Sequence, residues 1–169
     1  MISKIGVLTS GGDAPGMNAA IRGVTRYAIQ KGLAVEGIIR GYEGLLSHET
    51  MPLQRRDVGA IIHRGGTMLR TARCLDFLEK STQKKAAEYL KSLEIDALVV
   101  IGGDGSMRGA QALSQFGVPT IVIPGTIDND LAYTEMTLGY DTAVNSCIDD
   151  IRAIRATSRS HDRPGVVEV

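Results

Sequence analysis

The residues best suited to chemistry lie in three glycine-rich loops. One of these loops, residues 102–106, follows an apolar run at residues 97–101 and places Asp104 among glycines. Glycines let backbone N–H groups approach a phosphate closely because they carry no Cβ. A carboxylate beside a phosphate is favourable when Mg²⁺ lies between them, since this ion binds one or two carboxylates together with phosphate oxygens. The loop therefore predicts a site for Mg²⁺ and a nucleoside phosphate, although an ordinary strand-to-helix turn with an N-cap has the same pattern.

A second glycine-rich loop, residues 11–16, lies near the N-terminus. It separates an apolar strand expected at residues 5–8 from an amphipathic helix expected at residues 17–30. A strand–loop–helix junction directs free N–H groups and the positive end of the helix dipole toward the loop. This loop is a second candidate site for phosphate.

The third loop, residues 125–130, carries two carboxylates, Asp128 and Asp130, after another apolar strand. A carboxylate at a phosphoryl-transfer site can accept the proton of the attacking alcohol, and Arg70 and Arg73 could stabilise charge on the transferring group. Local Asx-turn chemistry is an alternative explanation of the Asp-Asn-Asp sequence.

Alternating strands and helices predict an α/β fold, a doubly wound parallel sheet with helices on both faces. Strands are expected at residues 5–8, 35–39, 97–101, 120–123 and 165–169, and helices at residues 17–30, 56–63, 80–93, 107–116 and 142–156. Residues 40–51 are expected to form a loop because they contain glycines and precede a proline. The three glycine-rich loops should meet, because the carboxyl ends of parallel strands share one edge of a sheet. The chain is expected to end inside its last strand, which favours half of a larger enzyme over a complete domain.

The composition excludes several classes of partner. Lysine plus arginine and aspartate plus glutamate both number 19, so no net charge attracts nucleic acid or an anionic membrane. The two cysteines, Cys74 and Cys147, are too few for a disulfide framework or a zinc site, and no apolar stretch is long enough to span a membrane. These features predict a cytoplasmic protein. The Walker-type phosphate loop is absent, and Arg108 stands where a dinucleotide-binding motif needs its third glycine.

Three longer motifs give the chain a family resemblance. Residues 9–18 (TSGGDAPGMN), 102–106 (GGDGS) and 124–130 (PGTIDND) resemble, in this order, bacterial ATP-dependent 6-phosphofructokinases. The resemblance extends over the whole chain. It implies a glycolytic phosphotransferase that transfers the γ-phosphoryl group of MgATP to the 1-hydroxyl of fructose 6-phosphate, giving fructose 1,6-bisphosphate and ADP.

The resemblance also implies roles for individual residues. It implies that Asp128 is the catalytic base, that Thr126 and Arg73 stabilise the transferring phosphoryl group, and that Asp104 binds Mg²⁺. The residues implied to contact ATP are Gly12, Arg73, Cys74, Gly103, Asp104, Gly105 and Ser106. Those implied to contact fructose 6-phosphate are Thr126, Ile127, Asp128 and Arg163, the last from a neighbouring subunit. Relatives that use pyrophosphate typically carry an acid and a lysine where this sequence has Gly105 and Gly125, so the resemblance favours ATP as the donor.

The resemblance also implies a homotetramer that is regulated by ADP or phosphoenolpyruvate. The resemblance implies an effector pocket that contains Arg22, Arg26, Arg55 and Arg155, although arginines at these spacings also occur on solvated helix faces. Ala60 stands where an acidic effector contact is expected, and Met107 and Arg108 replace the usual aromatic residue after the glycine loop. Family members are about twice as long as this chain. Residues 1–169 therefore match an N-terminal, ATP-binding half, which alone is expected to show little or no turnover.

Two other functions remain compatible with the motifs. The NAD kinase and lipid kinase group also uses a Gly-Gly-Asp-Gly loop, although the Gly-Thr-Ile-Asp-Asn-Asp sequence favours a sugar substrate. A non-catalytic nucleotide-binding module is the other alternative.

Overall fold

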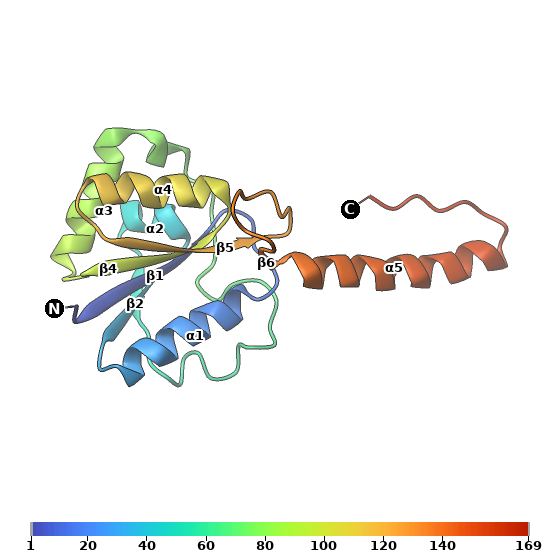
Figure 1. Ribbon diagram of the computed structural model, residues 1–169, viewed down its shortest axis with the longest axis horizontal. Helices are drawn as coiled ribbons and strands as arrows, with labels where there is room; N and C mark the ends of the chain where they lie inside the picture. The colour runs from blue at the N-terminus through green and yellow to red at the C-terminus, as the bar shows by residue number, and fades with distance from the viewer. Residues whose placement is uncertain (1, 169) are drawn as a thin grey trace.

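A six-stranded sheet forms the centre of the computed structural model, which describes residues 2–168 (Figure 1). The strand order is β3-β2-β1-β4-β5-β6. The strands are β1 (Lys4–Ser10), β2 (Ala34–Ile38), β3 (Thr50–Pro52), β4 (Ala97–Gly102), β5 (Thr120–Thr126) and β6 (Leu138–Gly139). All neighbours are parallel except β3, which pairs with β2 in the antiparallel direction. The predicted doubly wound sheet is confirmed, with one antiparallel strand at its edge.

Helices cover both faces of this sheet (Figure 1). The helical elements are α1 (Met17–Gln30), α2 (Gly41–Ser47), the 3-10 helix η1 (Leu75–Leu78), α3 (Lys80–Ser92), α4 (Asp104–Gln115) and α5 (Tyr140–Ser160). One core lies between the sheet and α1, and the other lies between the sheet and α2, α3 and α4. Helices on both faces of the sheet, as the sequence predicts, are therefore present.

The middle of each central strand is apolar because both of its faces are buried. In β1, Val7 belongs to the core under α1 and Leu8 to the core under α2, α3 and α4. In β4, Ile101 and Val100 divide in the same way. Successive side chains of a strand point to opposite faces, so a strand between two cores carries apolar residues on both of its faces.

The connections that follow β1 and β4 cross to opposite faces of the sheet. After β1 the chain passes to α1 on one face, and after the neighbouring β4 it passes to α4 on the other face (Figure 1). The loops that follow these two strands therefore diverge and leave a crevice at the carboxyl edge of the sheet, where ligands bind in open α/β sheets.

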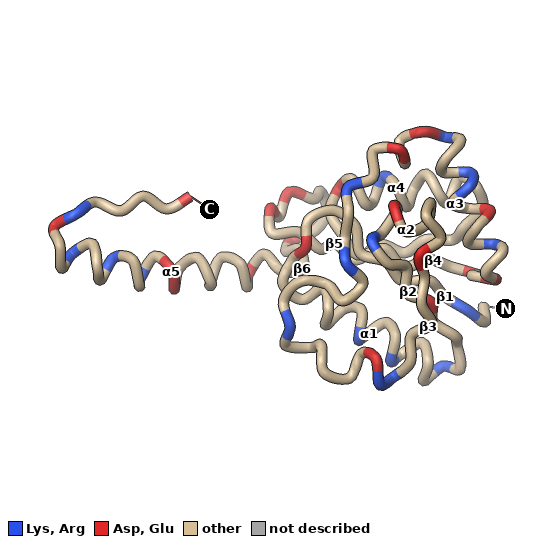
Figure 2. The backbone as a smooth tube through the Cα atoms, turned by 180° about the vertical axis from the view of Figure 1, so that it is seen from behind, with Lys and Arg blue, Asp and Glu red and all other residues tan. Residues whose placement is uncertain are grey.

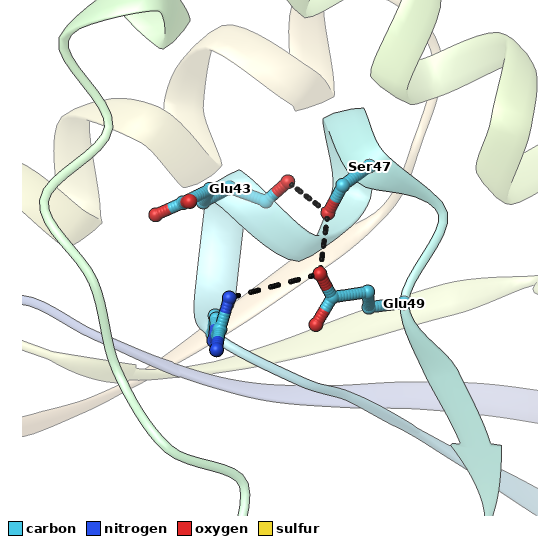
Figure 3. Close-up of polar contacts among 4 residues, drawn as sticks. Glu43, Ser47 and Glu49 are labelled. Atoms are coloured by element: carbon cyan, nitrogen blue, oxygen red, sulfur yellow. Dashed lines mark hydrogen bonds and ion pairs between the residues drawn. The ribbon is translucent and has the colours of Figure 1, made fainter.

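The prediction of a loop at residues 40–51 is wrong, since these residues form α2 and most of β3. Gly41 begins α2 with a φ of +60°, and a Cβ there would lie 2.5 Å from the carbonyl oxygen of Thr9. The glycine thus permits close packing of α2 against β1. The other end of α2 is held by Ser47, whose hydroxyl lies 3.0 Å from the carbonyl oxygen of Glu43 and 3.3 Å from the carboxylate of Glu49 (Figure 3).

Two further predictions from the sequence are also wrong. Residues 55–60 form turns in place of the helix expected at 56–63, and an arginine of α1, Arg22, donates hydrogen bonds to carbonyl oxygens of this segment. Residues 165–168 form no strand, because this exposed segment has no neighbouring strand to pair with, and Val169 lies outside the described residues. The prediction that the chain ends inside a strand is therefore wrong for residues 165–168.

Helix α5 projects away from the sheet and its covering helices (Figure 1). None of its residues is buried. Basic and acidic residues are both present along it, as they are over the rest of the chain (Figure 2). None of the helices within residues 2–168 combines the length and the apolar character needed to cross a membrane.

Candidate functional site

A cleft of about 630 Å³ lies at the carboxyl ends of β1, β4 and β5. All three glycine-rich loops line it, together with the segment from Ala72 to Leu78. The residues predicted from the family resemblance that line this cleft are Gly12, Arg73, Cys74, Gly103, Asp104, Gly105, Ser106, Thr126, Ile127 and Asp128. The expectation that the three loops meet at one edge is therefore confirmed by the fold.

The glycine loop after β4 is held in place by two hydrogen bonds at Ser106. The Ser106 hydroxyl donates to the carbonyl oxygen of Ser10 over 2.9 Å, and the Tyr42 hydroxyl donates to the carbonyl oxygen of Ser106 over 2.6 Å. Gly102 is required here, because a Cβ on it would lie 2.5 Å from the same Ser10 oxygen. The start of α4 is thus joined to both β1 and α2, and Asp104, its first residue, is exposed to the cleft.

Tyr42 forms part of the floor of the cleft. Its ring stacks on Phe77 with centroids 4.2 Å apart, and Gly109 of α4 lies so close that an added Cβ would be 2.5 Å from the ring. Burial raises the pKa of Tyr42 above its ordinary value, so the hydroxyl stays protonated and can donate to Ser106. Leu75 and Leu78 extend this apolar side of the cleft. An apolar side next to glycine loops is suited to a nucleobase beside its phosphates.

The segment before Cys74 has little regular structure and is held by polar side chains. The hydroxyl of Thr9 lies 2.9 Å from the hydroxyl of Thr67 and donates to the carbonyl oxygen of Arg70. Thr71 donates to the carbonyl oxygen of Gly11, which joins this segment to the first glycine loop. These bonds place Arg73 and Cys74 at the cleft, whereas Arg70 is not among the residues that line it.

The surroundings of Cys74 disfavour its thiolate form. Burial is the largest cause that raises its pKa, and the nearby carboxylates of Asp76 and Glu43 raise it further. A raised pKa disfavours the thiolate, which is the nucleophilic form of cysteine. The position of Cys74 at the cleft and its raised pKa therefore favour a contact role over a nucleophilic one.

The third loop is held by hydrogen bonds from Thr137 and by one within the loop. Thr137 donates its hydroxyl to the carbonyl oxygen of Thr126 over 2.6 Å, and its N–H to the side-chain oxygen of Asn129 over 2.9 Å. The N–H of Asp128 points to the hydroxyl of Thr126 at 3.2 Å. Because the backbone of Asp128 makes the local bond, its exposed carboxylate is available to a ligand in the cleft.

Asp104 is the candidate metal ligand of the cleft. Residues 2–168 contain no group of three or more His, Cys, Asp or Glu side chains that could hold an ion without other ligands. Asp104 instead forms an ion pair with Arg108, with 2.9 Å between Oδ2 and Nη2. A single exposed carboxylate beside glycine N–H groups fits Mg²⁺, which takes most of its remaining ligands from phosphates and water.

The family model for phosphofructokinase matches residues 4–169. The chain belongs to the phosphofructokinase family. It is 57% identical over 168 residues to ATP-dependent 6-phosphofructokinase 1 of Clostridium perfringens and 60% identical to the ATP-dependent 6-phosphofructokinase of Clostridium novyi. Each match covers 99% of this chain and 53% of the relative, so the chain spans about half the length of the curated relatives it matches.

Solved phosphofructokinase structures have the same fold. The phosphofructokinase of Saccharomyces cerevisiae matches with a TM-score of 0.86 and 36% identity, over 94% of this chain and 25% of that one. A pyrophosphate-dependent phosphofructokinase of Marinobacter aquaeolei matches with a TM-score of 0.72 and 26% identity, over 82% of this chain and 37% of that one. The α/β class predicted from the sequence is thus also that of solved phosphofructokinases.

Five residues predicted for this phosphofructokinase chain lie away from the cleft: Arg22, Arg26, Arg55, Arg155 and Arg163. Arg22 and Arg26 are on α1, and Arg22 donates to the carbonyl oxygens of Val58 and Gly59 over 2.6 and 2.9 Å. Arg55 lies in that same segment. Arg155 is on the projecting α5, and Arg163 follows that helix, beside His161. The described part of the chain does not bring Arg155 together with the arginines of α1.

Sequence reasoning missed the apolar side of the phosphofructokinase cleft. The sequence predicts a loop where Tyr42 lies. The segment that contains Leu75, Phe77 and Leu78 has no clear hydrophobic periodicity. The aromatic type of Tyr42 and Phe77 was a signal, because aromatic residues are scarce in this chain, at 4%. Their stacking depends on contacts between α2 and η1, which local sequence patterns do not reveal.

Proposed function

We propose that this chain supplies the nucleotide-binding half and the catalytic base of an ATP-dependent 6-phosphofructokinase. The observation that carries the proposal is that Asp104 and Asp128 line one cleft together with three glycine-rich loops. The printed names of the clostridial relatives support ATP and fructose 6-phosphate as the substrates. The rest of the site belongs to the second half of the protein in this proposal.

In the proposed mechanism, Asp128 accepts the proton of the 1-hydroxyl of fructose 6-phosphate as its oxygen attacks the γ-phosphorus of ATP. The bond between the γ-phosphorus and the bridging oxygen breaks, and ADP leaves with the electron pair on that oxygen. Arg73 and the hydroxyl of Thr126 stabilise the negative charge on the transferring group. Gly103, Gly105 and Ser106 present backbone N–H groups at the start of α4 to the phosphates.

Mg²⁺ bound to Asp104 and the phosphates would neutralise charge on the triphosphate. The chain's own contribution is the placement of Asp104. This residue begins α4, and the two hydrogen bonds that fix Ser106 hold that end of the helix. The carboxylate therefore has a defined position relative to the cleft.

The geometry around Gly105 supports ATP as the phosphoryl donor. No heavy atom lies within 4 Å of a Cβ added to this glycine, which lines the cleft. A side chain there would therefore occupy cleft space that the proposed nucleotide needs. ATP has to be distinguished from pyrophosphate as the donor, because a pyrophosphate-dependent phosphofructokinase also matches this chain, at 26% identity.

Substitution of Asp128 tests the proposal. In the full-length enzyme, Asp128→Ala should lower kcat by about 10²–10⁴-fold, the usual contribution of a general base, while MgATP binding persists. Glu135→Gln, exposed and in the same connection between β5 and β6, is the matched control. Unchanged turnover of Asp128→Ala would refute the assigned base. Turnover of NAD or diacylglycerol in place of fructose 6-phosphate would instead favour the NAD kinase and lipid kinase group. Binding of MgATP by the wild type without turnover of any of these three substrates would favour a non-catalytic module.

The proposal includes a cytoplasmic homotetramer with an effector pocket for ADP or phosphoenolpyruvate. Arg22, Arg26 and Arg55 form its part on this domain, which the bonds from Arg22 to the segment of Arg55 support. Arg155 and Arg163, on and after the projecting α5, are available to a neighbouring subunit. Arg163 is proposed to bind the sugar phosphate there.

A further inference from the structure

Arg108 is a cleft residue to which the family resemblance assigns no role. It lies one helical turn after Asp104 on α4, and its guanidinium turns back to the start of the helix to pair with that carboxylate at 2.9 Å. Both side chains are exposed, at 78% for Arg108 and 54% for Asp104. The pair therefore occupies the position proposed for Mg²⁺, but it is weakly held, because exposed i,i+4 ion pairs contribute little.

The charges that line the cleft give this ion pair a consequence for nucleotide binding. Among the described residues that line it, four are acidic (Asp13, Asp104, Asp128 and Asp130) and two are basic (Arg73 and Arg108). A triphosphate entering without metal meets an excess of negative charge. Arg108 reduces that excess at Asp104, the carboxylate nearest to the N–H groups at the start of α4.

We propose that Arg108 and Mg²⁺ take turns on Asp104, so that Arg108 sets how strongly nucleotide binding depends on the metal. The proposal rests on the proposed function, since it requires the cleft to bind a nucleotide. Without metal, Arg108 neutralises Asp104 and permits binding of the free nucleotide. With metal, Asp104 exchanges the guanidinium for Mg²⁺, and Arg108 is released toward the phosphates, to which a guanidinium can donate charge-assisted hydrogen bonds.

The geometry favours exchange over a permanent role for either partner. Asp104 is in the first turn of α4, where a carboxylate interacts favourably with the helix dipole whether or not Arg108 is paired with it. Loss of the pair therefore does not leave a buried charge, since both groups remain in contact with water. A partner that leaves easily is a requirement for a position that a metal must occupy in each cycle.

The test compares dissociation constants of a non-hydrolysable β,γ-imido analogue of ATP, with excess Mg²⁺ and with EDTA, by titration calorimetry. Arg108→Met removes the charge and keeps an unbranched side chain. It should weaken metal-free binding about threefold to tenfold while changing binding with Mg²⁺ by less than about twofold. With Mg²⁺, the variant loses a contact to the phosphates, but Mg²⁺ no longer has to displace a guanidinium from Asp104, and the two effects offset each other. Arg108→Lys should restore part of the metal-free affinity. Arg159→Met, on α5 and outside the cleft, is the control and should change neither constant.

A second comparison uses Asp104→Asn, which removes the shared ligand. In this background Arg108→Met should change both constants by the same factor, since no carboxylate is left to neutralise. The inference is overturned if Arg108→Met alone weakens binding equally with and without Mg²⁺, which would make Arg108 an ordinary phosphate contact. Absence of binding by the wild type under both conditions would overturn the proposed function and this inference with it, whereas binding with an unchanged ratio overturns the inference alone.

Discussion

Replacement of Thr25 by valine should stabilise the protein. Thr25 lies on the buried face of α1 and is fully buried, and its hydroxyl is the buried side-chain polar atom that lacks a hydrogen-bond partner among residues 2–168. Burial of a hydroxyl without a partner costs about 1–3 kcal/mol. Valine has nearly the same shape and a similar helix propensity, so the change removes this cost without creating a cavity.

A net gain of about 1 kcal/mol in the free energy of unfolding is expected, at the lower end of the cost of a buried hydroxyl without a partner. For a domain of this size, such a gain raises Tm by about 2–4 °C. Thr9 provides the matched control, because it is also fully buried but its hydroxyl contacts Thr67 and the carbonyl oxygen of Arg70, each at 2.9 Å. Thr9→Val removes both contacts and leaves the carbonyl oxygen of Arg70 without this donor, which should cost about 1–3 kcal/mol.

Urea unfolding followed by far-UV circular dichroism measures both changes under the same conditions. The midpoint should rise for Thr25→Val and fall for Thr9→Val, with similar m values. Destabilisation of Thr25→Val by as much as Thr9→Val would refute the reasoning, because it would mean that the two hydroxyls have equivalent surroundings.

Three further perturbations probe the floor of the cleft and the start of the sheet. Tyr42→Phe removes the bond to Ser106 and should lower stability by about 0.5–1.5 kcal/mol and weaken nucleotide binding, both measurable by thermal unfolding with and without ligand. Gly109→Ala places a Cβ 2.5 Å from the Tyr42 ring and should lower Tm despite alanine's better helix propensity; a higher Tm would show that the ring moves freely. The N–H groups of Ser3 and Lys4 and the Ser3 hydroxyl lower the pKa of Asp96 below its ordinary value of 3.8. Its contribution is thus present above about pH 4 and is lost as the pH falls through the lowered pKa, so Asp96→Asn should flatten the dependence of Tm on pH in that range.

The sequence predicted the parts of the fold that local patterns determine. Helix α1 has the predicted bounds, Met17–Gln30, because a glycine precedes it and its apolar residues repeat with the helical period. The sequence also predicts the central strands, because burial on both faces favours continuous apolar runs such as that of β4. Since parallel strands align their carboxyl ends, the meeting of the three loops followed from the strands alone.

The missed elements depend on contacts between distant residues. Gly41 and Gly44 suggested a loop, but Gly41 instead lets α2 approach β1, which no local pattern reveals. Helix expected at residues 56–63 is replaced by turns whose carbonyl oxygens accept hydrogen bonds from Arg22. The position of Arg73 likewise depends on Thr71, whose hydroxyl reaches the carbonyl oxygen of Gly11, 60 positions away in sequence.

The pairing of β1 with β4 has a kinetic consequence. Their register joins Ile5 to Ala97, and the nearby bond from Lys4 to Asp96 spans 92 positions of the sequence. Pairing over such separations is slow, whereas the first βαβ unit, β1–α1–β2, depends on nearer residues. The proposed nucleotide site lies across both strands, so a nucleotide would engage only chains in which the two distant strands have already joined. We expect it to act on the native protein by slowing unfolding, with little acceleration of refolding.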